Sequence, residues 1–458
     1  MSKKTKIIII CAAAFVVVAA AITTVLCIVL GKPKPAPDPQ PEQITLALDK
    51  TECEIAEDEV IALKATTNSD DAIKWTSDNV AVATVSSQGR VIGKTVGEAT
   101  ITASVGEITA ACKITVTKNA ALGTVISFEN PALRLSPASG AARIGGTVTA
   151  DGSTKSLDGA GATYEIEDES VATVAADGVV TPIGNGTTAV YVTACGRTRA
   201  VTVDVYTAIV SSVTDYVAML DHTGDKTARF YIANDIDFTG VPYKAKSGVL
   251  NIVSDDNTFM GEVDGGGHTI RNIVMDEANG YQSLFGMVTA FTLKNIAYEN
   301  VRFTSGAVGC GVAVNFLQHI TEGTDNVIYP SLISDASFDF VYETHGACGI
   351  AYNFYGGSVE DTFLSMRMKD GSAMNPASDS AIAKIFMIWF SPNYFNNLVV
   401  LAENGSVTTD HELRFKSLDP SVEAVYVCNT KIEAGYLVRT LFDQNVWSVK
   451  PGELPKLK

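Results

Sequence analysis

The chain has 458 residues, more than one compact core holds, which predicts roughly two to four domains. Its formal net charge of −17 excludes a general electrostatic footprint for nucleic acid or anionic lipid, because both need a basic protein surface. The eight cysteines form no C-x-x-C pair and have no histidine at ligand spacing, so we expect no metal site and no cofactor.

A long apolar segment lies near the N-terminus. Residues 7–30 carry no charge and would span about 36 Å as a helix at ~1.5 Å per residue, enough to cross a bilayer. Their small residues lie inside the run rather than after it, which favours an uncleaved transmembrane anchor over a cleaved signal peptide. Lys3, Lys4 and Lys6 direct the short tail 1–6 to the cytoplasm. We therefore expect a single-pass protein of the cell membrane, with the bulk of the chain extracellular.

A proline-rich segment follows the anchor. Residues 31–43 have proline at positions 33, 35, 37, 39 and 41, a composition that favours extended polyproline II and cannot form a core. The segment is predicted to be a stiff stalk that lifts the remaining domains off the membrane.

The next region contains an internal repeat. "VATVSSQGRV" at 82–91 returns as "VATVAADGVV" at 171–180, which predicts two copies of one domain. Each copy has short strands with alternating apolar residues, a pattern typical of a β-sandwich with one buried face per sheet. Trp75 and its counterpart Tyr164 are expected to be core aromatics.

Both copies resemble a known family. "KWTSDNVAVATVSSQGRVIGKTVGEATITA" (74–103) is similar to the bacterial Ig-like domain of group 2, whose pattern runs aromatic, polar turn, V-A-x-V, Gly and a G-x-A strand. "YEIEDESVATVAADGVVTPIGNGTTAVYVTA" (164–194) follows the same pattern with Tyr in place of Trp. The resemblance covers 44–118 and 124–207, and it implies two Ig-like domains that serve as extracellular spacer or adhesion modules.

Three cysteines lie in these copies. Cys53 and Cys112 fall on the first and last strands of the first copy, which are neighbours in Ig-like sandwiches. Two alternatives stay open for this pair, a disulfide or two buried free thiols. Cys195 has no partner in the second copy and is expected in the core.

The pattern changes from residue 208. "CGVAVNF" (310–316) recurs as "CGIAYNF" (348–354), and related apolar strands lie upstream and downstream. A second strand trails each of these, with a polar residue at its entry: Asn295, Asp335, Asp361 and Asn397. A polar residue at the same corner of successive coils predicts a parallel β-helix, because Asn and Asp tolerate left-handed backbone and hydrogen-bond along the stack.

A second family resemblance supports this interpretation. "FYIANDIDFTG", "FMGEVDGGGHTIRNIVMD" and "YQSLFGMVTAFTLKNIAYENV" resemble the opening coils of surface proteins with GLUG-type repeats, a pectin-lyase-like β-helix family. The closing "NVWSVKPGELPKL" is similar to the end of such domains. The predicted fold class is therefore all-β: two Ig-like β-sandwiches plus a right-handed parallel β-helix over 208–458, preceded by one N-terminal transmembrane helix.

One stretch decides between enzyme and binding protein. "GEVDGGGHTIRNIVMD" (261–276) offers Asp264 and His268 as an acid/base pair or, alternatively, as parts of a tight corner. The resemblance implies a structural corner, in which glycines permit positive φ, the Asp binds turn amides and the His packs on the adjacent coil. An acid/base site would need a second carboxylate or a nucleophile converging on His268, and the nearest candidates are Asp255 and Asp256. We predict no catalytic residues and assign five residues to the corner: Asp264, Gly265, Gly266, Gly267 and His268.

Adhesion or binding at the cell surface is the predicted function. A β-helix presents a long face suited to extended ligands, so the expected partners are extracellular glycans or surface proteins of a host or another cell. The candidate ligand contacts are four aromatics, for which core packing is the alternative: Tyr352, Tyr355, Trp389 and Tyr394. Two other functions stay open, a polysaccharide lyase or glycosidase on the β-helix and a purely structural envelope protein.

Overall fold

The computed structural model describes most of the chain after the predicted stalk. The described residues are 44–118, 123–243, 258–276, 281–304, 308–317, 319–320, 328–329, 331–343, 346–355, 357–369, 382–390, 394–402, 425–428 and 430–458. Within these ranges no helix is both long and apolar enough to cross a membrane. The predicted tail, anchor and stalk (1–43) lie outside them, as do Asp255 and Asp256.

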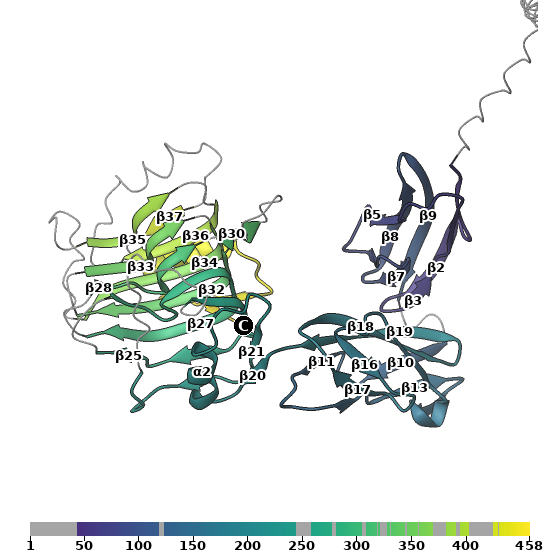
Figure 1. Cartoon of the computed structure of the whole chain (residues 1–458), viewed down its shortest axis with the longest axis horizontal. Coiled ribbons are helices and arrows are strands. Elements are labelled where there is room, and N and C mark those ends of the chain that lie inside the picture. Colours follow the sequence, from purple (N-terminus) through teal and green to yellow (C-terminus); the bar gives the residue numbers. More distant parts are fainter. Residues whose placement is uncertain are drawn as a thin grey trace, which may run out of the picture. The chain divides into compact units, whose positions relative to one another are not determined.

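The described chain is all-β apart from helices α2 (Val213–Leu220) and α4 (Lys431–Leu441) and the single 3-10 turn η2 (Asp158–Ala160). It divides into two compact units, one holding the first sandwich except Asp58–Val60 and the other holding Asp58–Val60 together with the chain from Lys118 onward. Figure 1 labels their strands.

The first sandwich is built from short strands in three sheets, ordered β2-β9-β8-β5, β3-β7-β6 and β1-β4. In β8 every second residue from Ala99 to Val105 is buried, as the alternating sequence predicts. Ile55, Val91, Ile101 and Ile114 form the centre of the core. The strands are β1 (Leu46–Leu48), β2 (Glu52–Ala56), β3 (Val60–Ala62), β4 (Ala65–Thr67), β5 (Lys74–Ser77), β6 (Ala83–Val85), β7 (Arg90–Gly93), β8 (Gly97–Val105) and β9 (Ile108–Thr117).

The second sandwich repeats two of these sheets as β11-β19-β18-β15 and β12-β17-β16, and its third sheet, β10-β13-β14, has one strand more than β1-β4. Its second strand pairs in parallel with its last, β11 with β19, as β2 does with β9 in the first sandwich. The strands are β10 (Thr124–Phe128), β11 (Ala132–Leu135), β12 (Ala142–Arg143), β13 (Gly146–Ala150), β14 (Ser153–Ser156), β15 (Thr163–Ile166), β16 (Ala172–Val174), β17 (Val179–Pro182), β18 (Gly186–Ala194) and β19 (Arg197–Val205).

A glycine opposite an aromatic ring recurs in both sandwiches. Gly89 has φ of +78°, and a β-carbon there would lie 2.7 Å from Trp75 Cζ2. Gly178 has φ of +79°, and its β-carbon would lie 2.7 Å from Tyr164 Cζ. Both aromatics are partly buried and pack against the core of their sandwich. Only glycine satisfies this turn, because the backbone is left-handed and the ring fills the space of a side chain.

The cysteines of the sandwiches are free thiols. Cys53 pairs with Ile114 across β2 and β9, so Cys112 is displaced by two positions along the neighbouring strand. That offset separates the two α-carbons by about 8 Å, beyond the ~7 Å that a disulfide spans. The structure therefore favours free thiols, of which Cys112 is buried and Cys53 only partly buried. Burial raises the pKa of the Cys112 thiol.

The expectation for Cys195 is wrong. This residue is exposed and has φ of +48° at the tip of the turn between β18 and β19. The alternating pattern continues up to Ala194, but the chain reverses at the next two residues, which places the thiol in solvent instead of the core.

Parallel strands dominate the chain after residue 208, and the strands from β20 to β37 are called the stack here (Figure 1). They are β20 (Ala208–Val210), β21 (Arg229–Ile232), β22 (Ile236–Asp237), β23 (Phe259–Asp264), β24 (Thr269–Arg271), β25 (Val274–Met275), β26 (Tyr281–Gln282), β27 (Met287–Phe303), β28 (Val308–Gly309), β29 (Ala313–Leu317), β30 (His319–Ile320), β31 (Ile328–Tyr329), β32 (Ser331–Tyr342), β33 (Gly346–Tyr355), β34 (Gly357–Met368), β35 (Ile382–Phe390), β36 (Tyr394–Ala402) and β37 (Val425–Cys428). The short pair β30 and β31 is antiparallel.

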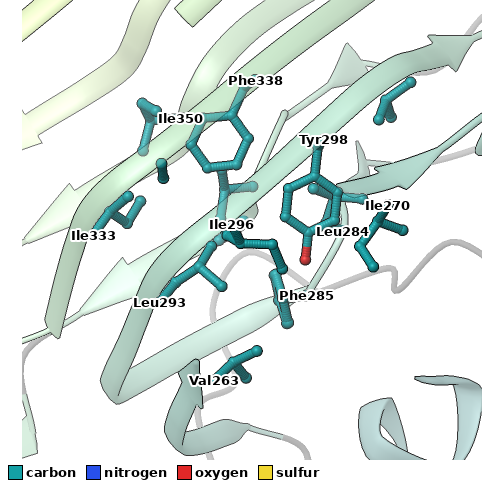
Figure 2. Close-up of a cluster of buried hydrophobic side chains, with 14 of the residues drawn as sticks. Val263, Ile270, Leu284, Phe285, Leu293, Ile296, Tyr298, Ile333, Phe338 and Ile350 are labelled. Carbon is teal, nitrogen blue, oxygen red and sulfur yellow. The ribbon is translucent and has the colours of Figure 1, made fainter. Parts of the chain in front are cut away.

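Successive strands of the stack pair in register, and apolar residues form continuous internal rows (Figure 2). One row consists of Val263, Leu293, Ile333 and Val359. A second consists of Ile270, Tyr298, Phe338, Leu364 and Val400. The Tyr298 and Phe338 rings stack with centroids 5.6 Å apart, which follows from the in-register pairing of their strands.

The polar residues predicted at the corners lie at equivalent positions between these two rows. Asn295, Asp335, Asp361 and Asn397 have φ of +52°, +46°, +40° and +55°. The Asn397 amide donates a hydrogen bond of 2.7 Å to Asp361 Oδ1. Left-handed backbone and bonding along the stack were both expected of Asn and Asp at these positions, and both are found.

The second sandwich and the start of the stack belong to one unit and share side-chain contacts. The rings of Tyr206 and Tyr231 lie 5.4 Å apart. The Arg134 guanidinium lies 4.6 Å from the Tyr231 ring centroid, and that of Arg229 lies 4.9 Å from the Tyr206 centroid. These cation–π and ring contacts hold the second sandwich against β21 in addition to the backbone that connects them.

Candidate functional site

The corner at 264–268 is held by hydrogen bonds on two sides. Asp264 Oδ1 accepts from Gly266 N–H at 3.0 Å and from the Asn295 amide at 3.1 Å. The Gly265 and Gly267 N–H groups donate to the carbonyl oxygens of Lys294 and Asn295, each at 2.8 Å. The Asp264 carboxylate is therefore directed into its own turn and toward the next strand.

Two of the three glycines of the corner have no room for a side chain. A β-carbon on Gly265 would collide with the Asn295 carbonyl, and one on Gly266 would lie 2.7 Å from the Tyr231 hydroxyl. Gly266 and Gly267 also have φ of +60° and +82°. Close packing and left-handed backbone together explain why glycine occupies all three positions.

His268 and Asp264 do not form a pair. The ring Nδ1 of His268 lies 3.3 Å from Oδ1 of Asp235, the residue directly before β22. Asp235 Oδ1 also accepts from Thr269 N–H at 3.0 Å, and its Oδ2 accepts from Arg271 at 2.7 Å. Burial opposes ionisation of Asp235, but the bonds from Thr269 and His268 and the charge of Arg271 outweigh it and lower its pKa.

Three further side chains complete a partly exposed polar patch beside His268. Asp237 pairs with Arg271 across β22 and β24, and the Asn272 amide donates to both Asp237 Oδ1 and Thr239 Oγ1 at 2.9 Å. The hydroxyl of Thr239, the amide of Asn272 and the backbone N–H of Thr239 lower the pKa of Asp237 to about 2. The polar patch comprises Asp235, Asp237, Thr239, His268, Arg271 and Asn272.

The polar patch carries charges that are already paired with one another. In the described part of the chain no group of three or more His, Cys, Asp or Glu residues has the geometry to hold a metal ion. The hydrogen-bond partner described for the His268 ring is Asp235 and not a hydroxyl or thiol nucleophile. The arrangement suits hydrogen bonding to a polar ligand.

Sequence reasoning missed most of this patch. Asp235 lies directly before β22 and Asp237 ends it, and they flank the buried Ile236, so their spacing of two places both carboxylates on the outer face. That spacing is the feature of the sequence from which the two carboxylates of the patch could have been predicted. Their partners His268 and Arg271 come more than 30 positions later, and only the parallel register of β22 and β24 brings them together.

The four aromatic candidates fall in strands whose side chains are not described at those positions. Tyr352 and Tyr355 belong to β33, Trp389 to β35 and Tyr394 to β36. In register, Trp389 pairs with Phe354 and Tyr394 pairs with Ser358. Their contact with a ligand stays a prediction.

Comparison with known proteins identifies one domain. Residues 54–116 match the bacterial Ig-like domain of group 2. Among curated proteins, none matches the chain.

Several solved structures are similar to parts of the chain. Domains 5 and 6 of the S-layer protein SbsC are 21% identical, with 35% of this chain and 96% of that chain covered and a TM-score of 0.18. A mutant intimin of EHEC O157:H7 is 20% identical, covering 19% and 51%, with a TM-score of 0.15. Human protocadherin-24 EC1-2 is 14% identical, covering 36% and 98%, with a TM-score of 0.15.

Proposed function

We propose that the chain is a bacterial cell-surface protein in which two Ig-like sandwiches carry a right-handed parallel β-helix that binds an extended extracellular ligand without catalysis. The match of residues 54–116 to a bacterial Ig-like domain carries the first part of this proposal. The second sandwich has the same strand order in two of its three sheets and the same contact between a left-handed glycine and an aromatic ring. We therefore assign it to the same kind of module.

The β-helix assignment rests on the pairing of the stack. Internal rows run from β23 or β24 through β27, β32 and β34 with parallel pairing at every step. Left-handed Asn and Asp recur at one corner of successive strands. Connections between parallel strands of one sheet are nearly always right-handed, which sets the proposed hand of the coils.

The polar patch is the surface that we propose for ligand contact. Its carboxylates, guanidinium, amide and hydroxyl offer donors and acceptors at fixed spacing on adjacent strands, a combination that suits sugar hydroxyls. The proposed ligands are glycans or glycosylated surface proteins. The aromatics at 352, 355, 389 and 394 are proposed as additional stacking contacts for sugar rings.

Binding without catalysis is proposed because the carboxylates beside His268 have structural partners. Asp264 bonds to Gly266 and Asn295, and Asp235 bonds to Thr269 and Arg271. A glycosidase would need one acid and one base or nucleophile about 5 to 10 Å apart across a bound sugar.

A glycan array with residues 44–458 tests the proposal. We expect binding to a subset of polysaccharides, with loss of binding on Asp235→Asn or Arg271→Ala and retention in the control Lys450→Ala, which lies outside the patch. Absence of binding to every glycan and surface protein tested would favour the purely structural alternative. Release of sugar fragments that stops in a folded His268→Ala variant would establish the lyase or glycosidase alternative.

Attachment through residues 7–30 is part of the same proposal. The 24 uncharged residues and the lysines before them support a single-pass anchor with the domains outside the cell. Extraction of bacterial membranes with alkaline carbonate would leave an anchored protein in the pellet. Release of a shortened chain into the medium would instead indicate a cleaved signal peptide.

A further inference from the structure

A second apolar core, called the outer core here, lies on the outside of the stack near its last strands. Its buried residues are Phe363, Val399, Leu401, Cys428, Ala434, Val438, Phe442 and Trp447. Phe363, Val399 and Leu401 alternate with the inward-facing Leu364 and Val400, so they lie on the opposite face of β34 and β36. All three are fully buried. Because an outward face of a stack is ordinarily exposed, another segment must cover these residues.

Helix α4 and the segment after it provide the cover. The Thr430 hydroxyl accepts from Glu433 N–H and caps the helix, which buries Ala434 and Val438 against the outer core. The Phe442 and Trp447 rings lie 4.9 Å apart in the same core. The segment then turns back as a hairpin of β38 (Trp447–Ser448) and β39 (Lys456–Leu457).

The hairpin extends past β34 and β36, whose outer faces are covered, toward earlier strands of the stack. The outward row that contains Val399 and Phe363 extends in register through Ser337, Ala297 and Thr269, back to the first strands of the stack. Ser337 Oγ donates to the Pro455 carbonyl at 3.5 Å, which places the hairpin against β32.

The end of β39 reaches the corner at 264–268. Lys456 Nζ lies 2.7 Å from Glu299 Oε1 on β27. A β-carbon built on Gly267 would lie 3.2 Å from the Lys458 carbonyl oxygen. Lys458 N–H in turn donates to Val446 O at 2.9 Å, so the far end of the hairpin is tied to the part that contains Trp447.

This path differs from that of an end cap. A cap covers the last strand of a stack, and each coil of a solenoid otherwise contacts only its neighbours. Residues 443–458 share the outer core with β34 and β36 at one end of the row, and toward the other end they contact β27 and approach the corner that precedes β24. They therefore add a direct connection between parts of the stack that are separated by several strands.

We propose that residues 443–458 form a clasp that fastens the corner at 264–268 and β27 to the outer core on β34 and β36. Release of β39 from the outer core then loosens the first strands of the stack as well as the last. Without the clasp, each strand of the stack would be stabilised only by adjacent strands. With the clasp, the first and last strands unfold together as one cooperative unit.

Hydrogen exchange of the full chain in detergent tests the clasp. Leu457 packs against the outer core, and Leu457→Asp is designed to detach β39. We expect the amides of Gly267 and Ala297, which bond to Asn295 O and His268 O, to exchange on the order of tenfold faster in this variant. The control Lys450→Asp alters an exposed hairpin residue and should leave both rates unchanged.

A charge swap provides a milder test. Lys456→Glu alone should accelerate exchange at Gly267, and the double variant Lys456→Glu/Glu299→Lys should restore the rate to within about twofold of the original. The proposal is overturned if Leu457→Asp abolishes protection of Lys458 N–H while Gly267 and Ala297 keep their original rates. It is also overturned if the swap restores nothing although Lys456→Glu had an effect.

Discussion

The phenol oxygens of Tyr216 and Tyr298 lie 2.9 Å apart, and both side chains are completely buried. Tyr216 belongs to α2, which Ser212 caps, and Tyr298 belongs to an internal row of the stack. Burial raises the pKa of each phenol, so both are neutral at physiological pH. The hydrogen bond thus fixes α2 to the interior of the stack.

Removal of one hydroxyl from this pair should lower the free energy of unfolding more than removal of both. Tyr298→Phe leaves the Tyr216 hydroxyl buried without its partner, and we expect the free energy of unfolding to fall by about 1 to 3 kcal/mol. In Tyr216→Phe/Tyr298→Phe no orphaned hydroxyl remains, so most of the loss should be recovered. Urea denaturation of residues 44–458 measures both values, and equal losses in the single and double variants would contradict this account.

Replacement of the glycine opposite Trp75 should destabilise the first sandwich. In Gly89→Ala the left-handed backbone is strained, and the new methyl group meets both the Leu63 carbonyl and the Trp75 ring at 2.7 Å. We expect a loss of about 3 kcal/mol. The matched control is Gly106→Ala, which has φ of +56° but no atom within 4 Å of the added carbon.

In Gly106→Ala only the left-handed backbone is strained, so the free energy of unfolding should fall by about 1 kcal/mol. Thermal denaturation of residues 44–118 compares the two variants. Similar melting temperatures for both would show that contact with the Trp75 ring contributes nothing.

Ionisation of Asp335 should oppose folding near neutral pH. Burial raises the pKa of Asp335, and the charges of Asp361 and Asp443 raise it further, while the Trp447 indole N–H favours the charged form. A pKa above the ordinary value means that the contribution of this group to stability is complete at low pH and is lost as pH rises through the folded-state pKa. Asp335→Asn keeps a residue that tolerates left-handed backbone and removes the titration.

The variant should therefore be more stable than the original chain near pH 7 and equal to it below about pH 3.5. Denaturant midpoints across this range measure the difference. A constant difference at every pH would show that the charge of Asp335 is not the cause.

The pKa of Asp237 should depend on the polar patch. Its value of about 2 follows from bonds to Thr239 and Asn272, so Asn272→Gly, which keeps the left-handed backbone, should move it up toward the ordinary ~3.9. A lowered pKa stabilises the folded chain at pH values above the ordinary pKa of Asp. This stabilisation is lost as the pH falls toward 2. Carboxyl titration by NMR measures the shift. Thr239→Val, which removes the strongest partner, should shift the value further than Asn272→Gly does.

Local signals in the sequence anticipated several features. The two sandwiches were predictable because the repeat preserves both the aromatic residue and the glycine that its ring requires, as Trp75 with Gly89 shows. The left-handed positions Asn295 and Asn397 were predictable because tolerance of that backbone is a property of the residue itself.

Features that depend on distant partners were not predictable. Helix α4 contains Gly435, which disfavours helix, and it forms against outward-facing residues of strands that precede it by many positions. The contact of Asp235 with His268 depends on the register of β22 and β24, which the sequence does not specify. Cys195 was placed wrongly because an alternating strand gives no sign of the residue at which it reverses.

The contacts between the second sandwich and β21 have a mechanical consequence. Arg229 N–H groups bond to Thr187 and to the Val205 carbonyl, and the Asn185 amide donates to the Thr227 carbonyl. A pulling force on the chain at this junction is therefore distributed over several side chains that must shear together, instead of stretching a single peptide linker. The junction should rupture abruptly in single-molecule extension, and Arg229→Ala should lower the force at which it does.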